Sequence, residues 1–343
     1  MSTSFVDNPE KCVVRAKWNT PLLRHLNTAF GVRYRYFGLP GVNLIDVNLW
    51  RDMIDDVVAF EPPSKVGDPR AAIDSLRRNM RVRGIPGRAY WGSFEEVVIL
   101  GSDYEGTKYS QDKVVTLYNL DFCDEISSRV QTREKGKQTW RFEAIRHVLR
   151  DQIECFQREG KPRHFILMIT IRNQINANKI KSFLSPTSLQ GDTQAFHQQC
   201  SEKDAIPGGA QPLIGTHTWA LKTLLFNMLC NYLGNPHISA LFFPQVMYQG
   251  TRKRVTDESG KVTYIPSPML HWLVLCRFCD IDLPTPDFCP PRFLWYPSLR
   301  VESSQDRLSW RQQTGEEPDG KRKPCPVEWF NEFGELVSAG LKS

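Results

Sequence analysis

The sequence predicts an α/β fold in which a mostly parallel sheet carries helices on both faces and ends in an antiparallel hairpin. Short apolar runs alternate with segments of helical periodicity about five times along the chain. Two of these runs, 114–118 and 165–171, are almost continuously apolar and are separated by a helical pattern at 142–156, which is typical of parallel strands buried on both faces. The last two runs, 238–243 and 269–278, flank a polar loop, which indicates the hairpin.

The composition is that of a globular protein and excludes several classes. The chain has 343 residues, of which 41% are hydrophobic and 24% are charged. No apolar run approaches the roughly 18 residues of a membrane span, and residues 1–10 lack the apolar core of a signal peptide. The nine cysteines, an odd number, indicate reduced thiols and not a disulfide framework. We therefore expect a cytoplasmic protein that does not bind a membrane.

We expect three parts along the chain. Residues 1–33 form an N-terminal helical segment, because apolar side chains recur there at helical spacing. Residues 34–280 form the main domain. It is interrupted at about 173–216 by a polar stretch rich in Gln, Ser and Gly, which is typical of an insertion or a lid. Residues 281–343 form a Pro- and Trp-bearing tail that wraps the sheet or docks on a protein partner.

The stretch from 34 to 61 is the most informative one. An apolar run that includes Phe37 breaks at Gly38-Leu39-Pro40-Gly41, and a second run, 57–60, ends on the carboxylate Glu61. A helix is expected between them, with the apolar positions Leu44, Val47 and Ile54. The order strand, glycine turn, helix, strand and acid predicts one βαβ unit, with the acid about twenty residues beyond the turn.

Such a unit suits a nucleoside. Glycines let a ligand approach the backbone, and a carboxylate at the end of the second strand can accept hydrogen bonds from both ribose hydroxyls. Because only Gly38 and Gly41 are present, the full three-glycine fingerprint of a pyrophosphate cradle is absent, which favours a nucleoside over a dinucleotide. The alternative is an ordinary turn followed by a surface glutamate.

A third strand is expected at 88–91, after a basic helix at 68–80, and it ends at Gly92-Ser93-Phe94. A glycine, a small polar residue and an aromatic ring suit the floor of a purine pocket, where Ser93 meets a base edge and Phe94 meets its face. The alternative is a turn into the helix expected at 95–100, with Ser93 as its N-cap.

The strand expected at 114–118 ends in a polar cluster formed by Asn119, Asp121 and Asp124. Polar and ionisable side chains at the tip of a buried strand are where an open α/β sheet places its chemistry. The competing interpretation is that Asn119 or Asp121 caps the next helix.

Positive charge is concentrated in three places, within a net charge of +6. Seven Lys or Arg fall in 129–150 against two Glu, and shorter clusters lie at 252–254 and 321–323. Solvated loops usually explain such clusters, and contact with nucleic acid is the functional interpretation.

A zinc site was weighed against buried thiols. Cys276 and Cys279 form one CxxC pair, Cys289 follows, and His271 and Cys325 are candidate fourth ligands. Structural zinc sites of this kind usually have two such pairs, so buried thiols are expected and no metal is assigned.

The order of elements resembles that of the class I S-adenosylmethionine-dependent methyltransferases. Their Rossmann-like sheet has seven strands, mostly parallel, and its last antiparallel strand comes from a hairpin. The resemblance covers about residues 30–278. It implies that S-adenosylmethionine is the cofactor and that seven residues bind it: Phe37, Gly38, Pro40, Gly41, Glu61, Ser93 and Phe94. It also implies that Asn119, Asp121 and Phe122 lie where the family's fourth motif meets the methyl acceptor.

Two departures from the family pattern affect the expected chemistry. The glycine turn is poorer in glycine than the family's usual loop, and Leu120-Asp121 replaces the two prolines that amino-methylating members carry between Asn119 and Phe122. With an amino acceptor, Asn119 would accept a hydrogen bond from it while Phe122 stacks on a flipped base. With a hydroxyl acceptor, Asp121 or Asp124 would act as general base. Nucleic acid is the favoured acceptor because of the basic segments.

Two other function classes fit parts of the sequence. A methyltransferase-like domain that has lost catalysis and serves as a binding subunit of a larger complex would explain the thin glycine turn, the insertion and the tail. A nucleotide-dependent oxidoreductase is disfavoured by the missing third glycine and by the terminal hairpin.

Overall fold

The computed structural model describes ten stretches of the chain: residues 8–64, 66–122, 128–134, 136–172, 238–250, 253–256, 262–265, 268–278, 299–310 and 324–333. The insertion expected at 173–216 lies outside them. No helix within these stretches is both long and apolar enough to cross a membrane.

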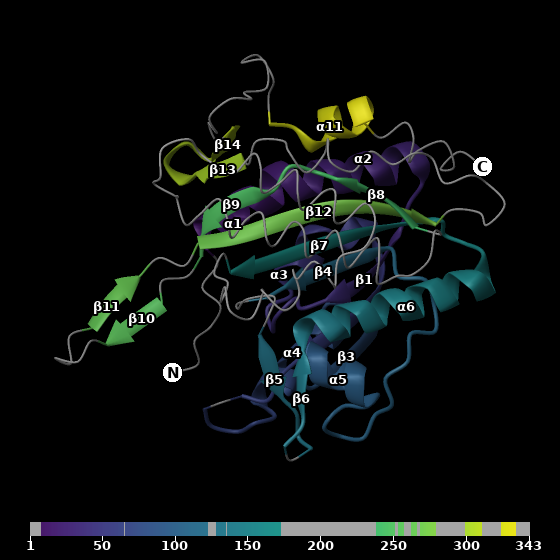
Figure 1. Cartoon of the computed structure of the whole chain (residues 1–343), viewed down its shortest axis with the longest axis vertical. Coiled ribbons are helices and arrows are strands. Elements are labelled where there is room, and N and C mark those ends of the chain that lie inside the picture. Colours follow the sequence, from purple (N-terminus) through teal and green to yellow (C-terminus); the bar gives the residue numbers. More distant parts are fainter. Residues whose placement is uncertain are drawn as a thin grey trace, which may run out of the picture.

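The described helices and strands alternate through the first half of the chain (Figure 1). The helical elements are α1 (Pro9–Val13), the π-helical segment η1 (Val14–Asn19), α2 (Thr20–Phe30), α3 (Ile45–Leu49), η2 (Arg51–Met53), α4 (Ala71–Val82), α5 (Phe94–Leu100), α6 (Arg141–Glu159), η4 (Ser303–Gln305) and α11 (Pro326–Phe333). The strands of the main sheet are β1 (Tyr34–Gly38), β2 (Ile54–Glu61), β3 (Gly87–Trp91), β4 (Leu117–Asp121), β7 (His164–Arg172), β8 (Ile238–Phe242), β9 (Val246–Gln249), β12 (Pro268–Phe278), β13 (Leu299–Glu302) and β14 (Arg307–Trp310).

The main sheet has the order β14-β13-β9-β12-β7-β4-β1-β2-β3, and β8 also pairs with β12. The five strands from β7 to β3 are parallel, and β12 runs antiparallel to β7, β8 and β9. The sheet therefore has ten strands and not the expected seven. Two of the additional strands, β13 and β14, come from the tail, and β8 and β9 replace one expected run.

Two short hairpins lie outside the main sheet: β5 (Arg129–Gln131) with β6 (Gln138–Trp140), and β10 (Lys253–Thr256) with β11 (Val262–Ile265). The second one projects from the body of the molecule (Figure 1). Both fall in segments that the sequence marks as basic.

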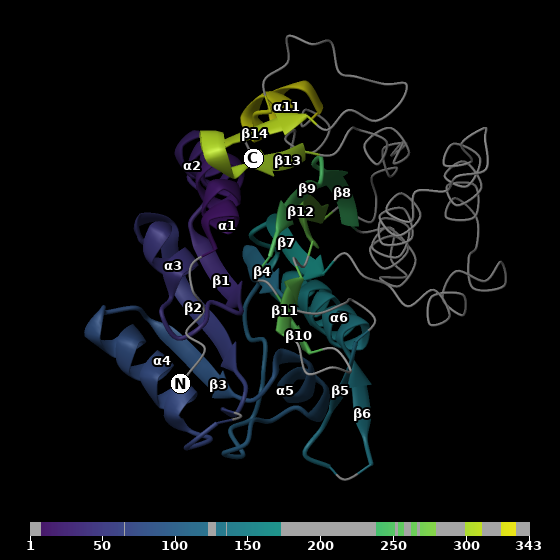
Figure 2. The ribbon, with the colours of Figure 1, turned by 90° about the vertical axis from the view of Figure 1, so that its left-hand side faces the viewer.

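Each face of the sheet is covered by its own hydrophobic cluster, because successive residues of a strand point to opposite faces. Tyr36 belongs to the cluster that α1, η1, α2, α3, α4 and α11 complete. Its neighbour Phe37 belongs to the cluster under α5 and α6. Figure 2 shows these two helical layers on opposite sides of β1 and β4. The N-terminal helices thus share a core with the main domain.

Two expected elements have different boundaries in the structure. Ile54 opens β2 instead of closing the preceding helix, which is limited to α3 and one 3-10 turn. β4 begins at Leu117 and not at Val114, because side chains of α6 accept hydrogen bonds from the backbone amides of the residues that precede the strand. The Val115 amide donates to Gln152 Oε1 at 2.9 Å, and the Val114 amide donates to Glu159 Oε2 at 3.2 Å. The polar residues Asn119 and Asp121, which were expected to follow the strand, consequently lie within it.

Candidate functional site

The strand order places a crevice at the carboxyl ends of β1 and β4. These two strands are neighbours, but the chain leaves β1 towards β2 and β3 and leaves β4 towards β7 on the other side. In open α/β sheets, ligands bind outside the strands at such a reversal. The residues at these strand ends are therefore the candidates for function.

The two glycines of the turn after β1 have different roles. A Cβ on Gly38 would overlap the carbonyl oxygen of Asn119, so this glycine allows β1 and β4 to approach each other. Gly41 has a left-handed φ of +63°, and a Cβ there would meet nothing within 4 Å. The turn is fixed from α4, where Asn79 Nδ2 donates to the Val42 carbonyl at 2.7 Å. Pro40 is buried. Of the two glycines of this turn, Gly41 is therefore the one that leaves open space beside the backbone, as far as the described residues show.

Glu61 and Trp91 form a pair of unsatisfied polar groups at the ends of neighbouring strands. They are register partners in the β2–β3 pairing. Partial burial raises the pKa of Glu61 to about 7, and among the described residues no hydrogen bond or ion pair reaches its half-buried carboxylate. The indole Nε1 of Trp91 is buried and has no hydrogen-bond partner among the same residues. Buried polar groups without partners are rare and costly, so this N–H beside a half-buried carboxylate points to a ligand.

The Trp91 ring is held in place by its neighbours. The Arg70 guanidinium lies 5.1 Å from its centroid, and the Tyr104 ring lies 5.4 Å away on centroids. Arg133 stacks in turn on Tyr104 at 5.6 Å. Sequence reasoning assigned Trp91 only to a strand, because nothing in a run of apolar residues marks which indole N–H will lack a partner.

The residues expected to form the floor of a purine pocket, Ser93 and Phe94, mainly stabilise the fold. Ser93 Oγ accepts a hydrogen bond from the Glu96 amide at 3.2 Å, which makes Ser93 the N-cap of α5, the alternative interpretation of this turn. Phe94 is 1% exposed, and Phe37 packs against it with centroids 6.0 Å apart. Phe122 is 3% exposed and lies 4.2 Å below the Arg141 guanidinium. All three rings belong to the aromatic core, and their expected contact with cofactor or acceptor stays a prediction.

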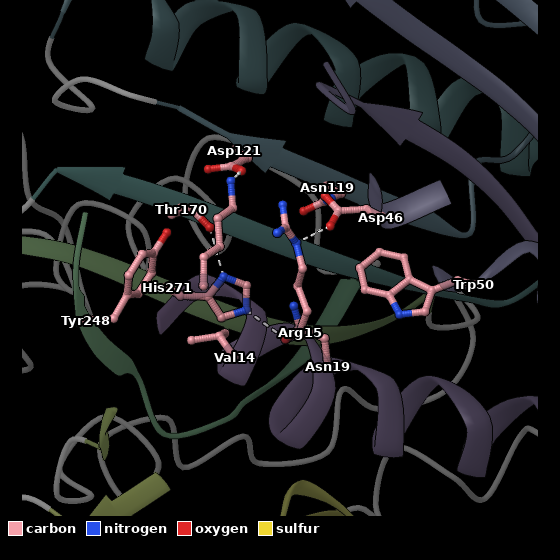
Figure 3. A pocket seen from close by; sticks show the side chains of 11 residues that line it. Val14, Arg15, Asn19, Asp46, Trp50, Asn119, Asp121, Thr170, Tyr248 and His271 are labelled. Atoms are coloured by element: carbon pink, nitrogen blue, oxygen red, sulfur yellow. Dashed lines mark hydrogen bonds and ion pairs between the residues drawn. The ribbon is translucent and has the colours of Figure 1, made fainter. Parts of the chain in front are cut away.

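Asn119 and Asp121 point to the opposite face from Phe122, towards the N-terminal helices (Figure 3). Asn119 Nδ2 donates to Asp46 Oδ2 at 2.8 Å and to the Tyr36 hydroxyl at 3.1 Å. Because a carboxylate only accepts hydrogen bonds, Asp46 fixes the orientation of this amide. Both N–H groups are used, so Asn119 Oδ1 is left as an acceptor for a ligand.

Asn119 and Asp121 line a pocket to which the first helices contribute three polar residues. Lys11 forms an ion pair with Asp121, and Arg15 forms one with Asp46. Asn19 Oδ1 lies 2.9 Å from His271 Nε2. The pocket is lined by Lys11, Val14, Arg15, Asn19, Asp46, Trp50, Asn119, Asp121, Thr170, Tyr248 and His271 (Figure 3).

His271 is a structural member of this pocket. Its Nδ1 lies 2.9 Å from Thr170 Oγ1, and burial lowers its pKa to about 3, so the ring is neutral at physiological pH. Because Asn19 Oδ1 accepts from Nε2, Nδ1 accepts from the Thr170 hydroxyl. His271 and Cys276 project from opposite faces of β12, so they cannot bind one zinc ion together. Cys279 and Cys289 lie outside the described residues.

The basic segment 129–150 carries less free charge than its composition indicates. Arg141 is buried in an ion pair with Glu95 at 2.7 Å, and Lys137 pairs with Glu134. Arg133 donates to Ser102 Oγ at 2.6 Å. Arg129 stacks on Trp140 at 4.2 Å, with its guanidinium at the surface.

No family model and no curated protein matches the sequence. Solved structures with a similar arrangement include an O-methyltransferase of tomaymycin synthesis from Streptomyces achromogenes in complex with S-adenosylmethionine, at 9% identity and a TM-score of 0.33, covering 80% of this chain and 91% of that one. An O-methyltransferase from Bacillus cereus gives the same four values. Precorrin-8w decarboxylase from Methanobacterium thermoautotrophicum gives 8% identity and a TM-score of 0.28, over 75% of this chain and 89% of that one. This likeness is too distant to carry a functional conclusion.

Proposed function

We propose that the protein binds S-adenosylmethionine at the carboxyl ends of β1 and β2 and transfers its methyl group to an amino or hydroxyl group. The observation that carries this proposal is the half-buried Glu61 carboxylate beside the buried Trp91 indole N–H, neither of which has a partner among the described residues. Glu61 lies on β2, the neighbour of β1, and Gly38 is the register partner of Ala59, two residues before Glu61. Trp91 lies on β3, one strand further from the glycine turn.

The residues at this edge fit the nucleoside part of the cofactor. A carboxylate that accepts from two ribose hydroxyls gains the partners that Glu61 lacks, and such hydrogen bonds favour its ionised form. The Trp91 N–H supplies a donor for a ribose or adenine acceptor. The open space beside Gly41 leaves room for the cofactor next to the backbone.

The bound cofactor supplies an electrophilic methyl group, and the chain's own task is to align the acceptor and exclude water. Asn119 Oδ1 is placed to accept a hydrogen bond from an amine or hydroxyl. Asp46 holds the amide in the orientation that exposes this oxygen. Asp121 or solvent would take the acceptor's proton as its nitrogen or oxygen gains the methyl group that bound S-adenosylmethionine would supply from its sulfonium.

Calorimetric titration of the full chain with S-adenosylmethionine tests the cofactor assignment. We expect saturable binding with one site and a micromolar Kd, since the nucleoside contacts are partly preformed. Titration with NADH is the matched control, because the turn lacks the third glycine that a pyrophosphate needs. Absence of heat with S-adenosylmethionine, or equal affinity for NADH, would contradict the proposal.

A second candidate function is a methyltransferase-like binding subunit that no longer catalyses. The ion pair between Lys11 and Asp121 favours it, because it occupies a side chain that an acceptor would need. Binding of S-adenosylmethionine without turnover on any acceptor class would support this candidate over the enzyme.

We also propose nucleic acid as partner and acceptor, bound at the surface around β5, β6 and α6. Arg129 and Arg150 are exposed there. Arg150 Nη2 lies 3.0 Å from His147 Nε2, and its ion pairs are long, at 3.7 Å to Asp151 and 3.9 Å to Glu154. We expect the double variant Arg129→Glu and Arg150→Glu to weaken binding of a single-stranded oligonucleotide at least about tenfold and to reduce its salt dependence. Fluorescence anisotropy at several salt concentrations measures both. Cofactor binding should stay unchanged, and an unaltered oligonucleotide affinity would remove this surface from consideration.

A further inference from the structure

Helix α1 lies over the tip of β4 and is held there mainly by polar contacts. Lys11 pairs with Asp121, and the side chains of the pair are 21% and 11% exposed. Asn8 Nδ2 donates to the Gln249 carbonyl at 2.7 Å, and the Gln249 amide donates to Glu10 Oε2 at 2.6 Å. Val13 is the one residue of α1 that is buried. Access to Asp121 from this side therefore depends on where α1 sits.

The segment that follows α1 is anchored quite differently. In η1, Trp18 is fully buried and packs edge-on against Phe243, with centroids 6.4 Å apart. Arg15 and Asn19, 8% and 3% exposed, reach Asp46 and His271. An apolar anchor and two buried polar contacts hold this segment to the sheet. The N-terminal helices are thus firmly fixed from η1 onward and weakly fixed before it.

The two parts meet at a change of helix type. α1 has five residues and continues into η1 without leaving the helical region, since Val13 and Val14 both have helical φ and ψ. η1 has π-helical geometry over its six residues, a rare form that often marks functional sites. The junction of the two helix types at Val13 and Val14 therefore separates the weakly held α1 from the anchored η1.

We propose that α1 is a hinged cover of the acceptor pocket, which pivots at η1 and is latched by the ion pair between Lys11 and Asp121. The identification of this pocket as the acceptor site rests on the proposed function. In the latched state the interior of the pocket has a free volume of about 10 Å³, which is room for about one water molecule. Release of Lys11 frees Asp121 and opens the approach to Asn119 Oδ1, while Arg15 stays on Asp46 and keeps the Asn119 amide oriented.

Hydrogen exchange of the full chain, followed by mass spectrometry, tests the cover. The reporters are the amides of Cys12 and Val14, which donate to the carbonyls of Asn8 and Glu10. We expect them to exchange at least about 100-fold faster than the amides of β4, because α1 opens without global unfolding. Lys11→Met keeps the aliphatic stem and removes the latch, so it should speed exchange of α1 about tenfold and leave β4 unchanged.

Lys17→Met is the matched control. Lys17 is on the same N-terminal segment, but its side chain is 50% exposed and its ion pair with Asp306, at 3.4 Å, lies outside the pocket. This variant should change exchange of α1 less than twofold. If α1 exchanges as slowly as β4 in both wild type and Lys11→Met, the segment is a fixed part of the core and the cover does not exist. A failure to bind S-adenosylmethionine would overturn the proposed function and leave this exchange result intact.

Discussion

Replacement of Glu61 with alanine is expected to weaken S-adenosylmethionine binding at least about 100-fold. The variant loses two hydrogen bonds from ribose hydroxyls to a carboxylate, and hydrogen bonds to charged groups contribute about 1.5–3 kcal/mol each. Calorimetry on wild type and variant measures the ratio of the two Kd values. Glu154→Ala, which removes an exposed carboxylate of α6, is the control and should bind as wild type does.

The pH dependence of this site has a defined sign. Burial raises the pKa of Glu61 to about 7, so in the absence of ligand the carboxyl group stabilises the fold below its unfolded pKa of about 4.3. That contribution is lost as the pH rises through about 7. Ribose hydroxyls favour the ionised form, so binding near pH 7 should release a proton and should strengthen between pH 6 and about 8.

Titrations in two buffers with different ionisation enthalpies measure this proton release. Glu61→Gln keeps the side-chain size and abolishes the ionisation, so its binding enthalpy should not depend on the buffer. If the wild type also shows no buffer dependence while it binds S-adenosylmethionine, Glu61 does not contact the cofactor. The ribose would then be bound by another group.

Replacement of Gly38 with alanine is expected to destabilise the fold by about 3 kcal/mol, the upper part of the range for overpacking. The new Cβ would overlap the Asn119 carbonyl, a backbone atom of β4 that cannot rotate away. Because the two central strands would have to separate, the site should also be disrupted. Urea denaturation followed by circular dichroism measures the loss.

Gly41→Ala is the matched control for this prediction. It should cost about 1 kcal/mol, because its left-handed φ is unfavourable for alanine while the space around it is open. If the two variants are equally stable, the close approach of β1 and β4 does not determine the identity of residue 38.

The βαβ unit could be predicted from the sequence because its signals are local. The two apolar runs end at residues that interrupt an apolar pattern, Gly38 and Glu61, and the short apolar pattern of each run identifies it as a strand. The polar tip at Asn119 and Asp121 was predicted for the same reason. That the rings of Phe37, Phe94 and Phe122 pack into the aromatic core could not be predicted, because a motif position does not show which face of the sheet a side chain takes.

The partners of the predicted residues could not be found in the sequence. Lys11 and Asp121 are 110 residues apart, and Arg15 and Asp46 belong to helices joined through the first strand. Such pairs depend on how the N-terminal helices pack across the sheet. The missing partner of Trp91 Nε1 is a property of the complete packing arrangement, which no local pattern records.

The N-terminal helices obtain some of their polar partners from a distant part of the chain. Asn8 meets a residue 241 positions later, and Asn19 meets His271, 252 positions later. Helix α1 also contacts β13, and α11 contacts α2. During synthesis on the ribosome, about the first thirty residues therefore cannot form these contacts until the last strands have emerged. Docking of the N-terminus is consequently a late step of folding, and a chain released early would expose the polar tip of β4 without its cover.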